Sequence, residues 1–288
     1  MIGRAGCRGA ATIVNAIATG KGAAFGITLE TDAEVRLDGS TGELRLPNQG
    51  EGGDLVKGCV RSITKKAGKP DIGGEVRIES EIPISRGLKS SSAVSNAVVL
   101  ATARALSLEI PDFELVLAGI EESIKAGVTV TGAFDDASAC FMGGVVATEN
   151  RSFTIMHRGA LDPDLIVLLH VPERRITKAS VKKLDFSPIA HEVEKAFDLA
   201  LRGEYLKAME LNSRAYSKVL DVSEDIAVLA RKKGALAAGI SGTGPATAIV
   251  CDRAQERDIL NSLERVEGQV LKAHVNATPA REVSPRLL

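Results

Sequence analysis

Aromatic side chains are scarce in this sequence, and tryptophan is absent altogether. Phe and Tyr make up only 3% of the 288 residues, whereas hydrophobic residues as a whole make up 44%. Aliphatic side chains must therefore fill most of the core. Charged residues add 25%, so the composition is typical of a soluble globular protein, and the length is sufficient for two domains.

Clustered positive charge is missing as well. The net charge is −1, and the chain has neither a basic block nor an acidic tail. Because binding to a nucleic-acid backbone depends on grouped Lys and Arg side chains, we expect no nucleic-acid partner.

Cysteine and histidine do not form metal-binding or redox motifs. The four cysteines are scattered without a CxxC pair, and the four histidines contain no HExxH pair. These spacings argue against a zinc site or a metalloprotease, and they are typical of inert thiols in a reducing compartment.

Long hydrophobic runs are absent too. Residues 165–171 (LIVLLHV) are far fewer than the roughly 20 apolar residues that cross a bilayer. Residues 10–18, which follow Arg4 and Arg8, have some features of a signal peptide, but Asn15 interrupts the apolar stretch. We therefore expect a cytoplasmic protein without a membrane partner.

Strands and helices are mixed along the chain without a regular alternation. Two alternating segments around an Asp-Gly-Ser-Thr-Gly turn predict a β-hairpin over residues 34–47. The other expected strands cover residues 74–85, 143–150, 165–171 and 247–251, and the expected helices cover residues 93–108, 187–203 and 223–234. This order favours an α+β protein with two domains, residues 1–155 and 156–288.

The start of the first expected helix has an unusual composition. Residues 83–100 (PISRGLKSSSAVSNAVVL) place a glycine, a lysine and three serines directly before an apolar helix. The N-terminus of a helix has unpaired N–H groups and partial positive charge, and glycine allows a ligand close to the backbone. With hydroxyl groups added, this pattern indicates a polyphosphate site, and the alternative is an ordinary helix with redundant serine caps.

Two later segments also combine glycine with polar side chains. Asp135 and Asp136 are adjacent within residues 131–144 (TGAFDDASACFMGG), where the alternative interpretation is a polar turn. Residues 239–250 (GISGTGPATAIV) place three glycines in six residues, which is also compatible with a simple tight loop. They do not form a dinucleotide fingerprint, because Thr247 replaces its third glycine, and the chain has no Walker A motif.

Taken together, the three segments resemble the GHMP kinases, a superfamily of small-molecule kinases. Its phosphate-binding signature, a proline followed by Gly-Leu-Gly-Ser-Ser-Ala, corresponds here to Pro83 and to residues 87–93, with Lys89 in place of the second glycine. Asp136 has the family's spacing to the following Gly-Gly pair, and residues 239–245 match the third motif. Residues 9–31 (GAATIVNAIATGKGAAFGITLET) are similar to the archaeal-type shikimate kinases, a branch of this superfamily.

This resemblance implies a two-domain GHMP kinase fold and a reaction. Residues 1–155 would form an ATP-binding domain with a left-handed βαβ unit, and residues 156–288 a ferredoxin-like domain, with the active site between them. The reaction would be the Mg²⁺-dependent transfer of phosphate from ATP to the 3-hydroxyl of shikimate, a step of aromatic amino-acid synthesis. The alternatives are homoserine kinase or another GHMP kinase, and a GHMP-fold binding protein without catalysis.

The resemblance also implies roles for individual residues. The residues expected to bind the ATP phosphates are Pro83, Ile84, Ser85, Arg86, Gly87, Leu88, Lys89, Ser90, Ser91, Ser92 and Ala93. Ser91 and Glu122 would bind Mg²⁺, although Glu122 beside Glu121 is equally compatible with a solvated helix face. Asp136 would be the general base, with Asp135 in reserve.

Shikimate carries several hydroxyl groups and one carboxylate, so its site should contain polar side chains and a cation. The residues expected to bind the substrate are Thr12, Asn15, Lys21, Ser241, Gly242, Thr243 and Gly244. The cations considered for its carboxylate are Arg8, Lys21, Arg174 and Lys178.

Overall fold

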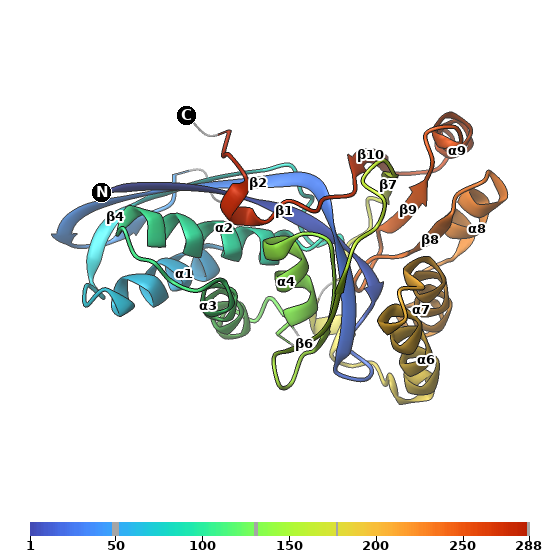
Figure 1. Cartoon of the computed structure of the whole chain (residues 1–288), viewed down its shortest axis with the longest axis horizontal. Helices are drawn as coiled ribbons and strands as arrows, with labels where there is room; N and C mark the ends of the chain where they lie inside the picture. Colours follow the sequence, from blue (N-terminus) through green and yellow to red (C-terminus); the bar gives the residue numbers. More distant parts are fainter. Residues whose placement is uncertain (48–51, 130–131, 177, 287–288) are drawn as a thin grey trace.

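The structure is a computed structural model that describes residues 1–47, 52–129, 132–176 and 178–286. It has two β-sheets, each with its own helices, and the molecule is elongated (Figure 1). The strands β1 (Ile2–Val14) and β2 (Lys21–Thr41) run along most of the first part and reach the second.

The first sheet has the order β3-β4-β2-β5-β6, and β1 pairs with β2. Its further strands are β3 (Leu44–Arg45), β4 (Ile72–Ser80), β5 (Val145–Glu149) and β6 (Thr154–Gly159). The helix α1 (Gly53–Lys66) connects β3 to β4, and these two strands are parallel, so the three elements form a βαβ unit. All other pairs in this sheet are antiparallel.

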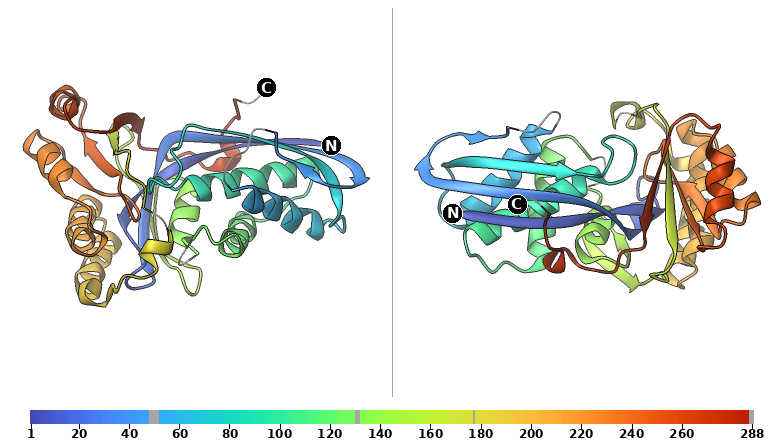
Figure 2. Two further views of the ribbon diagram at one scale, coloured as in Figure 1. Left: turned by 180° about the vertical axis from the view of Figure 1, so that it is seen from behind. Right: turned by 90° about the horizontal axis from the view of Figure 1, so that it is seen from above.

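Helices cover one face of the first sheet (Figure 2). They are α1, α2 (Ser90–Ala105), α3 (Asp112–Lys125) and α4 (Phe134–Met142). The helix α2 lies so close to β1 that a Cβ on Gly3 would lie 2.0 Å from the carbonyl oxygen of Ala101. Small residues therefore allow this close packing of helix on strand.

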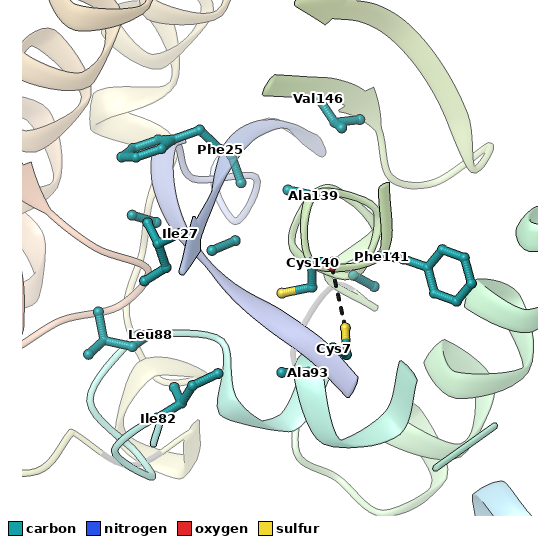
Figure 3. Close-up of a cluster of buried hydrophobic side chains, with 14 of the residues drawn as sticks. Cys7, Phe25, Ile27, Ile82, Leu88, Ala93, Ala139, Cys140, Phe141 and Val146 are labelled. Carbon is teal, nitrogen blue, oxygen red and sulfur yellow. Dashed lines mark hydrogen bonds between the residues drawn. The ribbon is translucent and has the colours of Figure 1, made fainter. Parts of the chain in front are cut away.

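Aliphatic side chains dominate the core between sheet and helices, as expected from the composition. Figure 3 shows a part of it, to which β2 contributes Phe25 and Ile27 and α4 contributes Ala139, Cys140 and Phe141. In the same cluster the thiol of Cys7 donates a hydrogen bond to the carbonyl oxygen of Cys140, at 3.3 Å (Figure 3). The four cysteines are buried and free.

The second sheet is antiparallel, with the order β10-β7-β9-β8. Its strands are β7 (Ile166–Val171), β8 (Ala237–Ile240), β9 (Thr247–Cys251) and β10 (Gln269–His274), and its main helices are α6 (Ala190–Leu201), α7 (Tyr205–Leu220), α8 (Asp225–Lys232) and α9 (Glu256–Leu263). The short elements are α5 (Lys178–Val181), η1 (Ser187–Ile189) and η2 (Ala280–Glu282). The chain order βαββαβ with spatial strand order 4-1-3-2 is the ferredoxin-like arrangement predicted for this half.

The predicted hairpin over residues 34–47 is wrong. The strand β2 continues to Thr41, and the two residues of β3 pair with β4 instead of β2. Over residues 31–37, β2 already has β1 on one edge and β4 on the other. No edge of β2 is free there to accept a returning strand.

No single position in the sequence separates the residues of the first sheet from those of the second. The expected boundary between residues 155 and 156 falls inside β6, which stays paired with β5, and the second sheet begins at Ile166. After β10 the chain returns to the first sheet, where the backbone N–H of Arg286 bonds to Asp32 (Figure 1). The division into domains at residue 155 stays a prediction.

Helices long and apolar enough to span a bilayer do not occur in the described parts of the chain.

Candidate active site

A cavity of about 710 Å³ lies where the three glycine-containing segments meet. The lining residues from these segments and from residues 9–31 include Asn15, Pro83, Ile84, Ser85, Gly87, Leu88, Lys89, Ser90, Ser91, Ser92, Asp135, Asp136, Gly242 and Thr243. Segments more than 150 residues apart in the chain thus contribute to one site.

The segment before α2 has a backbone suited to an anion. Ser85, Gly87 and Lys89 all have positive φ angles, of 59°, 83° and 66°. Lys89 is the N-cap of α2, and no side chain caps the first turn. The N–H groups of that turn have no acceptor in the helix, and its three serines line the cavity. The alternative of redundant serine caps is therefore not what the structure has.

The same segment is hydrogen-bonded to the glycine-rich loop of residues 241–246, the late glycine loop. The hydroxyl of Ser241 donates to the carbonyl oxygen of Gly87 at 2.9 Å, and the N–H of Ala246 donates to the carbonyl oxygen of Arg86 at 3.2 Å. A Cβ on Gly87 would lie 2.0 Å from the carbonyl oxygen of Ser241. Glycine is required at position 87 both by its φ angle and by this close approach.

The two adjacent carboxylates differ in their surroundings. Asp135 is 3% exposed, and the side-chain amide of Asn150 donates to its Oδ1 at 2.8 Å. Burial, followed by the nearby charge of Asp136, raises the pKa of Asp135 to about 7, and the charge of Lys89 opposes this shift. The surroundings of Asp135 therefore favour its protonated form more than water does.

Asp136 faces the cavity and a lysine. Its Oδ1 lies 2.9 Å from Nζ of Lys89, and the two side chains are 15% and 6% exposed. The distance is that of an ion pair, but Oδ1 accepts no hydrogen bond of ordinary geometry. Asp136 is therefore held against Lys89 at the wall of the cavity.

Comparisons with known proteins agree with these features. Residues 54–144 match the GHMP kinases N terminal domain, and residues 190–267 match the GHMP kinases C terminal domain. The chain is 42% identical to shikimate kinase from Methanothrix thermoacetophila over 281 residues, which cover 98% of this chain and 96% of the relative. It is 43% identical to shikimate kinase from Thermococcus kodakarensis, over 88% of this chain and 93% of that protein.

This chain belongs to the archaeal shikimate kinase family of the GHMP kinases. Solved structures of other GHMP kinases share its fold. Homoserine kinase from Cytophaga hutchinsonii superposes with a TM-score of 0.74 at 18% identity, over 96% of both chains. Mevalonate kinase from Methanococcus jannaschii superposes with a TM-score of 0.72 at 19% identity, over 96% of this chain and 98% of the other.

Several residues that the family resemblance assigned to the site do not line the cavity. They are Thr12, Lys21, Arg86, Ala93, Glu122, Ser241 and Gly244. The hydroxyl of Thr12 accepts a hydrogen bond from the N–H of Gly242 at 2.7 Å, so it supports the late glycine loop from behind. Ser241 also acts on the loop, through its bond to Gly87.

The charged residues Lys21 and Glu122, which the resemblance assigned to the site, form ion pairs with residues outside the cavity lining. Lys21 forms an ion pair with Glu194 of α6 at 2.9 Å, and Glu122 pairs with Lys125 on its own helix. A Cβ on Gly58 would lie 2.4 Å from Oε2 of Glu122, so this carboxylate lies against α1. Ser91 lines the cavity, whereas Glu122 does not.

The cations considered for the substrate carboxylate are also engaged or not described. Arg8 donates to the side chain of Asn276 at 2.7 Å, and Arg174 lies near Asp221 on the surface. The side chain of Lys178 lies outside the described residues.

Two features of the site were not found from the sequence. One is the set of apolar lining residues Leu55, Ile78, Val94, Ile120 and Val128. The other is the support of Asp135 by Asn150, whose Oδ1 also accepts a hydrogen bond from Thr148 at 2.6 Å. Aliphatic residues in helices and strands give no local signal of a ligand site. The asparagine at the end of β5, by contrast, is a polar residue next to an apolar strand, and this contrast could have marked it from the sequence.

Proposed function

We propose that this chain is a shikimate kinase, which transfers the γ-phosphoryl group of ATP to the 3-hydroxyl of shikimate and releases ADP and shikimate 3-phosphate. The observation that carries the acceptor is the identity of 42% to a shikimate kinase along 98% of the chain. The cavity supports the reaction type, because it combines an uncapped helix N-terminus with the carboxylate of Asp136. A binding protein without catalysis would not require this combination.

The cavity has groups suited to both the phosphates and the base of ATP. The first turn of α2, with Ser90, Ser91 and Ser92, would bind the phosphates through N–H groups and hydroxyls. The apolar lining residues, Leu55 and Ile120 among them, would then hold the adenine.

Oxygen ligands for Mg²⁺ are present beside the phosphate position. The hydroxyl of Ser91 and the carboxylate of Asp136 both line the cavity. Mg²⁺ is commonly held by one or two such groups together with phosphates, and it neutralises charge on the transferred group. Glu122, the other expected ligand, would have to leave Lys125 to take part.

Phosphoryl transfer then requires an oriented acceptor hydroxyl. Its oxygen attacks the γ-phosphorus while the bond to the bridging oxygen breaks, and the electron pair stays on ADP. The hydroxyl proton passes to the carboxylate of Asp136. Asn15 and Thr243, which line the cavity, would bind the other hydroxyls of the acceptor.

A cytoplasmic location stays a prediction. The four buried, free cysteines are compatible with a reducing compartment.

The test is the choice of acceptor. Purified protein with MgATP should release ADP with shikimate, and slowly or not at all with homoserine, mevalonate, galactose or glycerate. A site that pairs several ring hydroxyls and a carboxylate leaves polar groups unpaired with other acceptors, which costs up to roughly 10⁴-fold in kcat/KM. Asp136→Asn is the control for background ATP hydrolysis. Preferential turnover of homoserine would refute the shikimate assignment and leave the phosphate site standing.

A further inference from the structure

The turn that connects β1 to β2 forms part of the cavity wall. Asn15, Ala16 and Ile17 all line the cavity. The side-chain amide of Asn15 donates to the carbonyl oxygen of Gly242 at 2.7 Å, so this turn lies directly against the late glycine loop. We call residues 15–18 the acceptor turn, because the proposed function assigns Asn15 to the acceptor.

The acceptor turn also lies beside the acid pair. A Cβ on Gly22 would lie 2.3 Å from Oδ2 of Asp135 and 2.9 Å from the Cβ of Ala16. The methyl group of Ala16 and the carboxylate of Asp135 are therefore close neighbours. The segment before α2, by contrast, is bonded to the late glycine loop, through Gly87 and Ser241. A shift of the acceptor turn would thus change the acceptor side of the cavity more directly than the phosphate side.

One buried hydroxyl holds both ends of the acceptor turn. Tyr216 of α7 is fully buried, and its hydroxyl donates to the carbonyl oxygen of Asn15 at 2.8 Å. The same hydroxyl accepts a hydrogen bond from the backbone N–H of Ala18 at 2.9 Å. Asn212, one helical turn earlier on α7, adds a third bond, because its Oδ1 accepts from the N–H of Asn15 at 2.9 Å. A helix of the second sheet's layer therefore holds this part of the cavity wall.

The bond between Tyr216 and Asn15 lies in the interior of the protein. Asn15 is 7% exposed, so water has little access to its carbonyl oxygen. A buried polar group that loses its partner is costly, and the loss changes an equilibrium by about 10-fold or more. Without the tyrosine hydroxyl, other conformations of the acceptor turn therefore become more populated.

We propose that Tyr216 is a positioning residue for the acceptor, whose hydroxyl holds the acceptor turn in the conformation that places Asn15 at the cavity wall. This proposal rests on the proposed kinase function, since it assigns a task within that reaction. Tyr216 is not among the described residues that line the cavity, so it acts through the turn. The alternative is a purely structural role, in which the hydroxyl stabilises the fold and its loss leaves acceptor binding unchanged.

The decisive variant is Tyr216→Phe. It removes the hydroxyl and keeps the ring, which packs against Phe186 with ring centroids 5.7 Å apart. We expect the KM for shikimate to rise by about 10-fold or more, because the acceptor must bind to a turn that is less often in the productive conformation. The KM for ATP should change by less than about threefold. Steady-state kinetics with each substrate varied in turn measures both values.

Tyr205→Phe is the matched control. Tyr205 is the other tyrosine of the chain and begins the same helix, and its hydroxyl is hydrogen-bonded to Nε2 of His157 at 2.7 Å. It is 9% exposed, so this variant also removes a hydrogen bond from a buried tyrosine. The KM for shikimate should stay at the wild-type value in Tyr205→Phe, and thermal unfolding of both variants compares their cost in stability.

Three results would overturn the proposal. The first is a wild-type KM for shikimate in Tyr216→Phe. The second is an equal rise of the KM values for shikimate and ATP, and the third is the same rise for shikimate in Tyr205→Phe, because both fit a general loss of structure.

A second measurement separates acceptor binding from turnover. Isothermal titration calorimetry of shikimate into protein saturated with a non-hydrolysable ATP analogue should give a Kd about 10-fold or more higher in Tyr216→Phe, and a wild-type Kd in Tyr205→Phe. An unchanged Kd in Tyr216→Phe would overturn the proposal. Failure of wild-type protein to phosphorylate shikimate would instead refute the proposed function, and the two variants are then compared with the acceptor that is phosphorylated.

Discussion

Replacement of Gly87 by alanine tests the contact that joins the two parts of the site. Gly87 has a φ angle of 83°, and its added Cβ would lie 2.0 Å from the carbonyl oxygen of Ser241. Non-bonded atoms of this kind stay beyond 3.0 Å, so the two segments must separate by at least 1 Å. In Gly87→Ala we therefore expect residues 83–93, the phosphate segment, to separate partly from the late glycine loop.

The magnitude follows from two separable costs. The left-handed conformation costs an alanine about 1–2 kcal/mol. Separation of the segments also breaks the bonds from Ser241 to Gly87 and from Ala246 to Arg86, each contributing about 0.5–1.5 kcal/mol. The expected loss in the free energy of unfolding is therefore about 2–5 kcal/mol.

Gly203→Ala is the matched control. Gly203 has a φ angle of 81°, but nothing lies within 4 Å of its added Cβ, so this variant has the backbone cost alone. Since about 1 kcal/mol lowers Tm by roughly 2–4 °C in a protein near this size, Gly87→Ala should melt roughly 2–12 °C below Gly203→Ala.

The two variants also differ in expected activity. The KM for ATP should rise in Gly87→Ala and stay at the wild-type value in Gly203→Ala. Gly87 belongs to the phosphate segment and lines the cavity, whereas Gly203 does not. Thermal unfolding and steady-state kinetics on the same preparations measure both effects. Equal Tm and equal KM in the two variants would refute the close approach of Gly87 to Ser241.

Two further predictions concern single groups in the cavity. Ser91→Ala should lower turnover on the order of 10²-fold, most strongly at low Mg²⁺, because a metal ligand and a phosphate contact are lost together; wild-type turnover at low Mg²⁺ would exclude Ser91 as a ligand. Asp135→Asn should become more stable relative to wild type as pH rises from 4 to 7. The pKa of Asp135 rises from 3.8 to about 7 on folding, so unfolding releases a proton in this window and wild-type stability falls as pH increases. Denaturant unfolding at several pH values measures this difference, and a difference that does not vary with pH would contradict the assigned environment of Asp135.

The sequence predicted well those parts of the site whose chemistry is local. Glycines and serines before α2, the acid pair of α4 and the late glycine loop are each a short segment, and members of all three line one cavity. The ferredoxin-like half was expected from the family resemblance. Sequence pattern alone predicted its strands β7 and β9, which are short and apolar, but not β8 and β10.

Contacts between distant segments could not be predicted in the same way. Lys21 was expected to bind substrate, but its partner Glu194 is 173 residues away, on a helix whose position no local pattern gives. The hairpin prediction failed for a similar reason, since only the complete sheet shows that both edges of β2 are occupied over residues 31–37. The ion pair of Lys89 with Asp136 depends on a left-handed backbone at Lys89, a conformation that residues other than glycine seldom adopt.

The length of β1 and β2 limits how this enzyme can open and close. Near their connection the strands bind the second part of the molecule: the N–H of Asn15 bonds to the side chain of Asn212, and Lys21 pairs with Glu194. Further along, β2 is the central strand of the first sheet and β1 pairs with it. A continuous ladder across both parts resists rotation about a hinge, so entry of substrate and release of ADP are left to movements of the loops around the cavity.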